Sequence, residues 1–522
     1  MPIHASAGTD VPTELHNHST PWWRQPHLLK LNTTITFLIL YSSAVGYDGS
    51  LLNGLQALPQ WNQFMDHPTG TWSGFINVVY WMSLGLACPV SSWAANKYGR
   101  RAPILLAFAP LAIGTGLQAG AKSPAEWIAG RAVVGIATAF FSTAVPLLVT
   151  EIAHPTQRSV ITALVNAGFF VGAIVAAWAC FGARNRGAWA WKIPCLLQIA
   201  CPLAGLPGLL LAPESPRWLV SVGRPDAARG TLAKIHAGGD VNSSIVEFEM
   251  NEISLAIAAE KEAHESTSYA TMVSTPALRR RFFITCSLAV FSQWVGNGVV
   301  SYYLSTVLTT VGITGVTDQT LISACLQIWS LFAAFGGGLC VERLGRRPLF
   351  LLSCGIMFVS FVIITALSGH FATSGSKSSG LAMIPFVFLF NAGYGIALTP
   401  LQIAYPLEIW PFHLRSRGIS LAWMAMVLAV IFNVFVNPIA LERIGWKYYV
   451  VFVAVLVAYG VTVYFCYPET RGYTLEEMAV VFGDEVEVLG AHARAAGTGA
   501  ELRILLTGDG DGDSVKDRMC KE

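Results

Sequence analysis

Twelve long apolar runs divide this chain, and they constrain its fold more than any other feature. A membrane-spanning helix needs about 20 apolar residues, because about 30 Å of hydrocarbon must be crossed at about 1.5 Å per residue. Of the 522 residues, 53% are hydrophobic and 12% are charged, whereas a soluble domain carries roughly 25% charged residues. The sequence therefore predicts an all-α integral membrane protein with twelve transmembrane helices. The runs lie at about 31–52, 72–95, 102–121, 125–150, 159–181, 190–212, 282–308, 320–341, 347–368, 382–406, 417–440 and 446–467.

Lys and Arg gather in alternate loops, and this pattern predicts the orientation. With both ends of the chain inside, most of the 33 Lys and Arg residues fall on the cytoplasmic side, as the positive-inside rule requires. The 31 Asp and Glu residues nearly balance them, so the charge does not favour a nucleic acid as partner. No short apolar core precedes the first run, and a cleaved signal peptide is not expected.

Three short motifs of the first half of the chain return in the second half, in the same order. They are Gly99-Arg100-Arg101 with Gly345-Arg346-Arg347, Glu151 and Arg158 with Glu408 and Arg415, and Pro213-Glu214-Ser215 with Pro468-Glu469-Thr470. The pairs follow runs 2 and 8, runs 4 and 10, and runs 6 and 12. Such an internal repeat predicts two six-helix lobes that rock around a site between them, as in secondary transporters.

The repeat and the runs together predict the division of the chain. The expected segments are a cytoplasmic tail at 1–30, an N-terminal lobe at 31–212, a cytoplasmic linker with helices at 213–281, a C-terminal lobe at 282–467 and a cytoplasmic tail at 468–522.

These motifs resemble those of the sugar porter family of the major facilitator superfamily. The family marks are Pro213-Glu214-Ser215-Pro216-Arg217-Trp218-Leu219 after the sixth run and Pro468-Glu469-Thr470-Arg471-Gly472 after the twelfth. The stretches Gly46-Tyr47-Asp48-Gly49-Ser50 and Trp446-Lys447-Tyr448-Tyr449 resemble the fungal lactose-permease and hexose-transporter branch. The resemblance covers all twelve runs. It implies the major facilitator fold, a small intracellular helical domain in the linker, and transport by alternating access.

Arginines and acids at the cytoplasmic helix ends are predicted to form a latch. Arg–carboxylate pairs there can hold the inner ends of the lobes together when the protein faces outward, and they must part when it faces inward. The alternative is that the arginines only satisfy the positive-inside rule. Asn96 stands where the family usually has Asp, so we expect a weaker latch in the N-terminal lobe. The latch set is Arg100, Arg101, Glu151, Arg158, Glu214, Arg217, Glu342, Arg346, Arg347, Glu408, Arg415 and Glu469.

Two ionisable residues lie inside the apolar runs, away from their ends: Asp48 in the first run and Arg131 in the fourth. Charges inside a membrane are costly and indicate function. Both fall in the outer half of the membrane, at depths that permit pairing. A carboxylate beside an arginine stays ionised, and one that loses it in a dehydrating cleft takes up a proton. The pair is predicted to be a proton switch, and the resemblance implies the same role. Alternatively, Asp48 caps the first helix with access to water and Arg131 snorkels.

Neutral polar side chains dominate the rest of the runs. Amides offer both donors and acceptors, which suits an uncharged ligand rich in hydroxyl groups, although each one could instead bond two helices together. Two departures from the family do not favour an ordinary hexose: Ser292 replaces a usual Gln, and Leu398 stands where a Trp is expected. The predicted substrate residues are Asn166, Gln293, Asn297, Ser330, Asn391 and Asn433.

The leading interpretation is a monomeric plasma-membrane symporter that moves a neutral mono- or disaccharide with a proton, its partners being the sugar, the proton and the lipid bilayer. The alternatives are a facilitator or exporter of another neutral polyol or glycosylated metabolite, and a sugar sensor that does not transport. The sequence holds no GxxxxGK[ST] loop and no metal-ligand spacing among its ten cysteines, so neither an enzyme nor a metal or other cofactor is expected.

Overall fold

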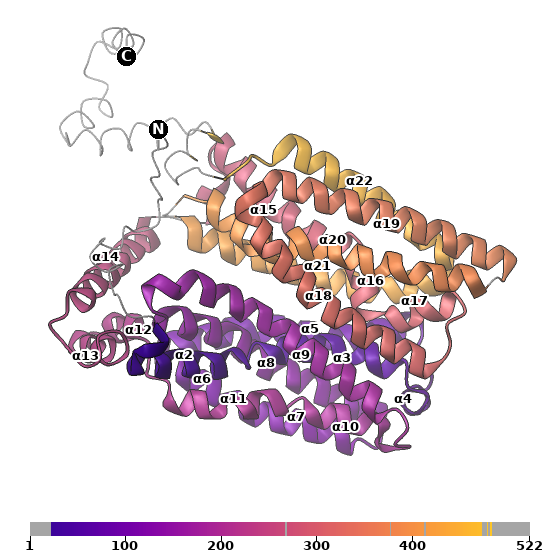
Figure 1. Ribbon diagram of the computed structural model, residues 1–522, viewed down its shortest axis with the longest axis horizontal. Helices are drawn as coiled ribbons and strands as arrows, with labels where there is room; N and C mark the ends of the chain where they lie inside the picture. The colour runs from indigo at the N-terminus through magenta and orange to yellow at the C-terminus, as the bar shows by residue number, and fades with distance from the viewer. Residues whose placement is uncertain are drawn as a thin grey trace, which may run out of the picture.

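The computed structural model describes residues 22–266, 269–375, 377–411, 414–471, 478 and 481–482. Every regular element in these ranges is a helix, and none is a strand. Long helices follow because in hydrocarbon each backbone N–H and C=O must be bonded within its own segment. Figure 1 shows two bundles of roughly parallel helices, one from each half of the chain, with α12 (Pro216–Ser221), α13 (Pro225–His236) and α14 (Ser244–Ser266) beside one end. We call this the inner end, following the predicted orientation.

The N-terminal lobe holds six traverses. They are α2 (Pro26–Ile39) with α3 (Ser43–Gln56), α5 (Gly70–Tyr98), α6 (Arg101–Leu106) with α7 (Phe108–Gly120), α8 (Pro124–Ile152), α9 (Arg158–Ala183), and α10 (Trp189–Leu197) with α11 (Ala200–Leu211). The short α4 (Pro59–Phe64) joins the first two at the outer end.

The C-terminal lobe repeats the pattern. Its traverses are α15 (Pro276–Trp294) with α16 (Asn297–Tyr302) and α17 (Leu304–Thr310), α18 (Val316–Leu344), α19 (Arg346–Ser374), α20 (Lys377–Ile409), α21 (Arg415–Ile444), and α22 (Tyr449–Cys466) after the 3-10 turn η5 (Gly445–Tyr448). The turns η1 (Trp22–Arg24), η2 (Pro155–Gln157) and η3 (Tyr269–Val273) complete the described elements.

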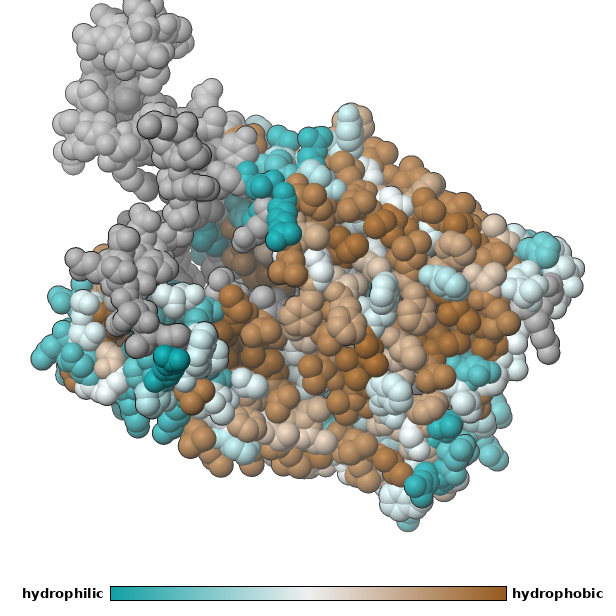
Figure 2. All heavy atoms as spheres, in the orientation of Figure 1, coloured by the Kyte–Doolittle hydropathy of each residue, from teal (hydrophilic) through white to brown (hydrophobic). Residues whose placement is uncertain are grey.

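Ten stretches of the described helices are long and apolar enough to cross a membrane, and they follow the path of the twelve expected runs. The tenth, Arg417–Cys466, covers most of α21 and all of α22. The seventh expected run is broken into α15, α16 and α17. Large apolar side chains cover the outside (Figure 2), with Leu86 75% exposed and Phe465 73% exposed, which suits contact with lipid rather than with water. The all-α membrane fold is confirmed.

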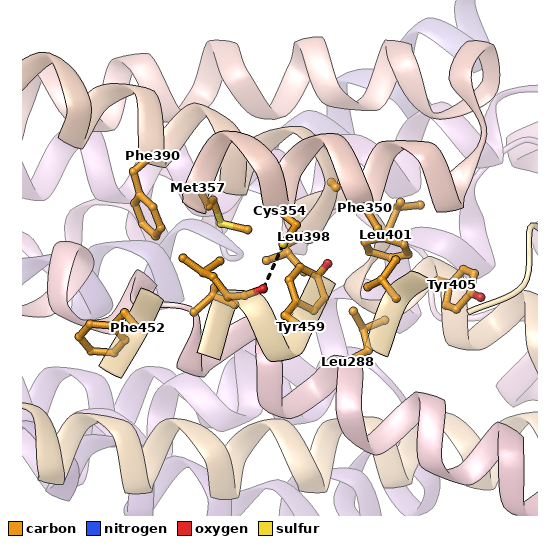
Figure 3. Close-up of a cluster of buried hydrophobic side chains, with 14 of the residues drawn as sticks. Leu288, Phe350, Cys354, Met357, Phe390, Leu398, Leu401, Tyr405, Phe452 and Tyr459 are labelled. Atoms are coloured by element: carbon orange, nitrogen blue, oxygen red, sulfur yellow. Dashed lines mark hydrogen bonds between the residues drawn. The ribbon is translucent and has the colours of Figure 1, made fainter. Parts of the chain in front are cut away.

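Close packing inside each lobe comes from small residues and interlocking apolar side chains. In the C-terminal lobe, Leu288, Met357, Phe390 and Tyr459 are among the buried side chains that fill the space between α15, α19, α20 and α22 (Figure 3). There the Cys354 thiol donates to the Leu456 carbonyl at 3.2 Å. Lipid is as apolar as these side chains, so their mutual fit, rather than burial from water, stabilises each lobe.

Glycine allows α3 and α9 to touch through their backbones. A Cβ atom at Gly172 would lie 1.8 Å from the Ser43 carbonyl oxygen, so Gly172→Ala is expected to destabilise the N-terminal lobe by about 1–3 kcal/mol, as overpacking does. The measurement is the thermal unfolding of the purified protein in detergent. Gly116→Ala is the matched control, since nothing lies within 4 Å of a Cβ there. Equal melting temperatures for the two variants would contradict the close approach.

The two lobes touch along α5 with α21 and along α9 with α18. Near the outer end, Asn53 Nδ2 donates to the Ser323 hydroxyl at 3.4 Å, and Asn53 Oδ1 accepts from the main-chain N–H of Ser305 at 3.4 Å. All three residues are buried. The outer ends of the lobes are therefore in contact in this structure.

The linker helices attach to the inner end of the N-terminal lobe through polar contacts. His236 of α13 is buried, with Nδ1 2.6 Å from Glu249 Oε2 and Nε2 3.1 Å from the Ile152 carbonyl oxygen. Arg158 of α9 lies 3.7 Å from the same Glu249 and 3.8 Å from Glu252. These contacts join α13 and α14 to the inner ends of α8 and α9.

Candidate functional site

Asp48 of α3 and Arg131 of α8 meet inside the N-terminal lobe. Asp48 is 1% exposed and Arg131 is 2% exposed. Arg131 Nη2 donates to the main-chain oxygen of Asp48 at 2.9 Å, while the Thr138 hydroxyl donates to Asp48 Oδ2 at 3.0 Å. The two residues singled out by the sequence are therefore neighbours, but the arginine bonds the backbone of Asp48 rather than its carboxylate.

Several polar atoms of Asp48 and Arg131 make no hydrogen bond. Asp48 Oδ1 and Arg131 Nε and Nη1 are buried without a hydrogen-bond partner. The Arg131 guanidinium instead lies 4.9 Å from the ring centre of Tyr80 and 6.0 Å from that of Trp127. A buried polar group without a partner costs about 1–3 kcal/mol. A direct ion pair would give these atoms partners, whereas a proton on Asp48 would remove its buried charge.

Thr138 and Tyr80 are site residues that the sequence reasoning missed. Thr138 follows Arg131 by two helical turns, so both side chains lie on one face of α8. That spacing is a signal that could have identified Thr138. Tyr80 of α5 is fully buried, but nothing in its sequence surroundings indicates that it faces Arg131.

The polar side chains of the C-terminal lobe gather where its first traverse breaks. Gly296 has a φ of 103° between α15 and α16, a conformation that favours glycine. The break frees main-chain carbonyls inside the membrane, and the Asn433 amide donates to one of them, that of Gln293. Asn437 in turn donates to Asn433 Oδ1, and the Tyr448 hydroxyl donates to Asn437 Oδ1 at 2.9 Å.

The predicted residues Gln293 and Asn433 are thus brought together, and Gln402 joins them. The Gln402 amide donates to the Ser292 hydroxyl at 3.0 Å, and the Gln293 amide donates to the same hydroxyl at 3.3 Å. Ser292 occupies the position of the expected glutamine, so Gln402 from α20 supplies an amide there instead. The sequence analysis missed both Gln402 and Asn437, although Asn437 lies one turn after Asn433 on the same face of α21.

The other predicted substrate residues are placed differently. Half-buried Asn297 accepts a hydrogen bond from Ser301 at 2.9 Å, and Ser330 donates to the Leu326 carbonyl of its own helix at 2.7 Å. Asn391 is half-buried on α20. Asn166 belongs to α9, but its side chain lies outside the described residues.

At the inner end of the N-terminal lobe, Arg100 forms a bidentate ion pair with Glu151. Its Nε and Nη2 donate to the two carboxylate oxygens at 3.0 Å each, and its main-chain N–H donates to Glu214 Oε1 at 2.8 Å. Asn96 accepts from Arg100 Nη1 at 3.1 Å, so the unusual residue takes part without a charge.

The C-terminal lobe has the equivalent contact. Arg346 Nη2 donates to Glu408 Oε1 at 2.7 Å, and Glu469 accepts from the main-chain N–H groups of Arg346, Arg347, Thr470 and Arg471 at 2.8, 3.0, 3.0 and 2.9 Å. Partial burial raises the pKa of the Glu469 carboxyl, but these four donors outweigh it and hold the pKa below its ordinary value. Glu469 stays ionised near neutral pH, and its contribution is lost only when the pH falls through that lowered pKa.

The remaining latch residues lie around these pairs. Arg101 and Arg347 donate to the carbonyls of Leu210 and Tyr464 at 3.4 and 2.6 Å. Arg217 and Arg415 are half-buried, and the Glu342 side chain lies outside the described residues. The ion pairs Arg100–Glu151 and Arg346–Glu408 each join residues of one lobe. A latch between the lobes stays a prediction.

No group of three or more His, Cys, Asp and Glu residues in the described part of the chain could hold a metal ion.

Residues 34–482 match the family model described as "Sugar (and other) transporter". The chain belongs to this family. The resemblance seen in the sequence motifs is confirmed, and the protein is a multi-pass membrane transporter of the major facilitator superfamily.

Curated relatives from fungi agree with this assignment. The chain is 27% identical over 476 residues to "MFS glucose transporter mfs1" of Aspergillus flavus, covering 85% of this chain and 88% of the relative. It is 25% identical over 465 residues to "High-affinity glucose transporter 1" of Candida albicans, covering 84% of each. Among solved structures, the fold matches the proton:xylose symporter XylE of E. coli with a TM-score of 0.67 at 20% identity, covering 87% of this chain and 99% of that one.

Proposed function

We propose that this protein moves a neutral mono- or disaccharide across the plasma membrane together with a proton, by alternating access and as a monomer. The observation that carries the coupling is the buried Asp48 carboxylate, which has one oxygen without a hydrogen-bond partner and an arginine beside it. Because Oδ1 of this buried carboxylate has no hydrogen-bond partner, it can bind one proton. Relatives named as glucose transporters and a neighbour named as a proton:xylose symporter support the substrate class and the coupling.

The substrate is proposed to bind between the lobes against the amide cluster of the C-terminal lobe. The Ser292 hydroxyl accepts from the amides of Gln293 and Gln402, and the Asn433 amide donates to the Gln293 main-chain carbonyl. A neutral set of donors and acceptors suits sugar hydroxyls. Asn166, Asn297, Ser330 and Asn391 complete the proposed lining. Ser292 and Leu398, which depart from the family pattern, favour a second candidate substrate, another neutral polyol or a glycosylated metabolite.

The inner helix ends are proposed to change partners during transport. Arg100 and Arg346 already hold acids of their own lobes, so each lobe presents a rigid charged edge. Closing the inner end would bring the two edges together, with Glu214 and Glu469 at the ends of α11 and α22 beside them.

Uptake of a panel of labelled mono- and disaccharides, measured with the external pH in cells that lack their own sugar carriers, tests this function. We expect one or a few sugars to enter with matching alkalinisation of the medium. Entry without a pH change would establish a facilitator and remove the role of Asp48. A protein present at the cell surface that moves no sugar would contradict sugar uptake and favour export or sensing.

A further inference from the structure

We propose that Tyr80 is a positioning residue for proton coupling, its ring holding the Arg131 guanidinium away from the Asp48 carboxylate while the outer ends of the lobes are in contact. This inference rests on the proposed proton coupling and goes beyond it, because it names the side chain that keeps Arg131 apart from the Asp48 carboxylate. The ring centre lies 4.9 Å from the guanidinium carbon, within the range of a cation–π contact.

The contacts of Arg131 show why a ring is needed. Its guanidinium is buried, and only Nη2 has a hydrogen-bond acceptor, the main-chain oxygen of Asp48. A buried charge with so few acceptors would ordinarily turn to the nearest carboxylate. The faces of Tyr80 and Trp127 offer the alternative, since a cation–π contact is stronger where water is excluded.

The contacts of Asp48 show what this arrangement achieves. The Thr138 hydroxyl occupies Oδ2, and Oδ1 has no partner. With Arg131 held against Tyr80, Oδ1 is the position for a proton. If Arg131 moved to Oδ1 instead, the ion pair would exclude that proton. The ring therefore favours the proton-loaded carrier.

Other groups face this site and do not replace Tyr80. From α10, Cys195 lies near both Arg131 and Asp48, and from α9, Cys180 lies near Tyr47. From α16 of the other lobe, Tyr302 lies near Tyr80. Thiols and phenols carry no charge at neutral pH unless strongly perturbed, so Arg131 and Asp48 are the charges that decide the balance.

Tyr80 also lies next to a contact between the two lobes. The next residue, Trp81, makes an edge-to-face contact with Tyr302 of α16 at 6.1 Å between ring centres. Trp81 and Tyr302 belong to different lobes and border the buried cluster of Val78, Val430 and Val434. Parting the outer ends breaks this contact, so α5 is free to shift and Arg131 can reach the carboxylate.

The test compares Tyr80→Leu, which removes the ring, with Tyr80→Phe, which keeps it, using the labelled sugar found in the uptake panel. We expect Tyr80→Leu to move the pH of half-maximal uptake downward by about one unit, which corresponds to about 1.36 kcal/mol, because the attraction of the ring no longer competes with the ion pair. Tyr80→Phe is expected to keep the pH profile of the natural protein. Sugar exchange by each variant shows that it is folded and inserted, because exchange needs no net proton movement.

A series of fluorinated phenylalanines at position 80 covers the case in which Tyr80→Leu does not fold. Each added fluorine weakens the attraction of the ring for a cation with little change of size, so the pH of half-maximal uptake is expected to fall step by step along the series. A profile unchanged along the series and in Tyr80→Leu would overturn the inference. Asp48→Asn, measured in parallel, separates this failure from failure of the proposed coupling: concentrative uptake that survives Asp48→Asn rejects the coupling itself.

Discussion

Asp48→Asn is expected to abolish uphill accumulation of the substrate while leaving its exchange partly intact. With one proton moved per sugar, an inward gradient of one pH unit supplies about 1.4 kcal/mol, enough for roughly tenfold accumulation. The amide cannot bind that proton, yet it keeps the shape of the carboxyl and the hydrogen bond from Thr138. The accumulation ratio should therefore fall from about ten to about one, and counterflow exchange should stay within about threefold of the natural protein.

The measurement uses purified protein in liposomes, with a pH gradient of one unit and the membrane potential held at zero. Asp226→Asn is the matched control, because Asp226 is an exposed acid in the first turn of α13. It should accumulate sugar as the natural protein does. Tenfold accumulation by Asp48→Asn would exclude Asp48 as the coupling group, and a natural protein that only equilibrates sugar would exclude symport.

The spans and the two lobes could be predicted from the sequence because they depend on local quantities. The length of an apolar run determines whether it can cross the membrane, and repeated motifs divide the chain wherever they occur. The broken seventh traverse was not predicted, because an apolar run does not reveal that Gly296 adopts a positive φ. Asn433, which donates to one of the freed carbonyls, lies far along the chain from the break.

The candidate site could be predicted in part. A buried acid and a buried base inside a membrane have few alternatives to each other, so Asp48 and Arg131 could be placed together from depth alone. The detail of their contact could not, because it depends on the rotation of α3, α5 and α8 about their axes. Thr138 and Tyr80 are ordinary residues for apolar helices, and only the packed structure shows that one bonds the carboxylate and the other faces the guanidinium.

Asn433→Leu is expected to have the second large effect, lowering the exchange rate about tenfold. The Asn433 amide donates to the Gln293 carbonyl and accepts from Asn437. Leucine leaves both of those groups without their partner inside the membrane. Hydrogen bonds between membrane helices contribute about 0.6–2 kcal/mol each, so the loss of two amounts to about 1.2–4 kcal/mol, and about 1.4 kcal/mol corresponds to a tenfold change. The break between α15 and α16 then loses its fixed geometry, and the amides beside it lose their positions.

Counterflow of the labelled substrate and thermal unfolding in detergent measure the two consequences. Ser360→Ala is the matched control, because Ser360 is also a buried polar residue of this lobe but donates only to a carbonyl of its own helix, that of Ile356. It should change neither quantity by much, since that carbonyl keeps its place in the helix ladder. If Asn433→Leu exchanged sugar at the natural rate and unfolded at the natural temperature, the amide cluster would support neither the helix break nor the substrate. A variant that keeps its stability but loses exchange would assign Asn433 to the substrate, whereas loss of both together would assign it to the break.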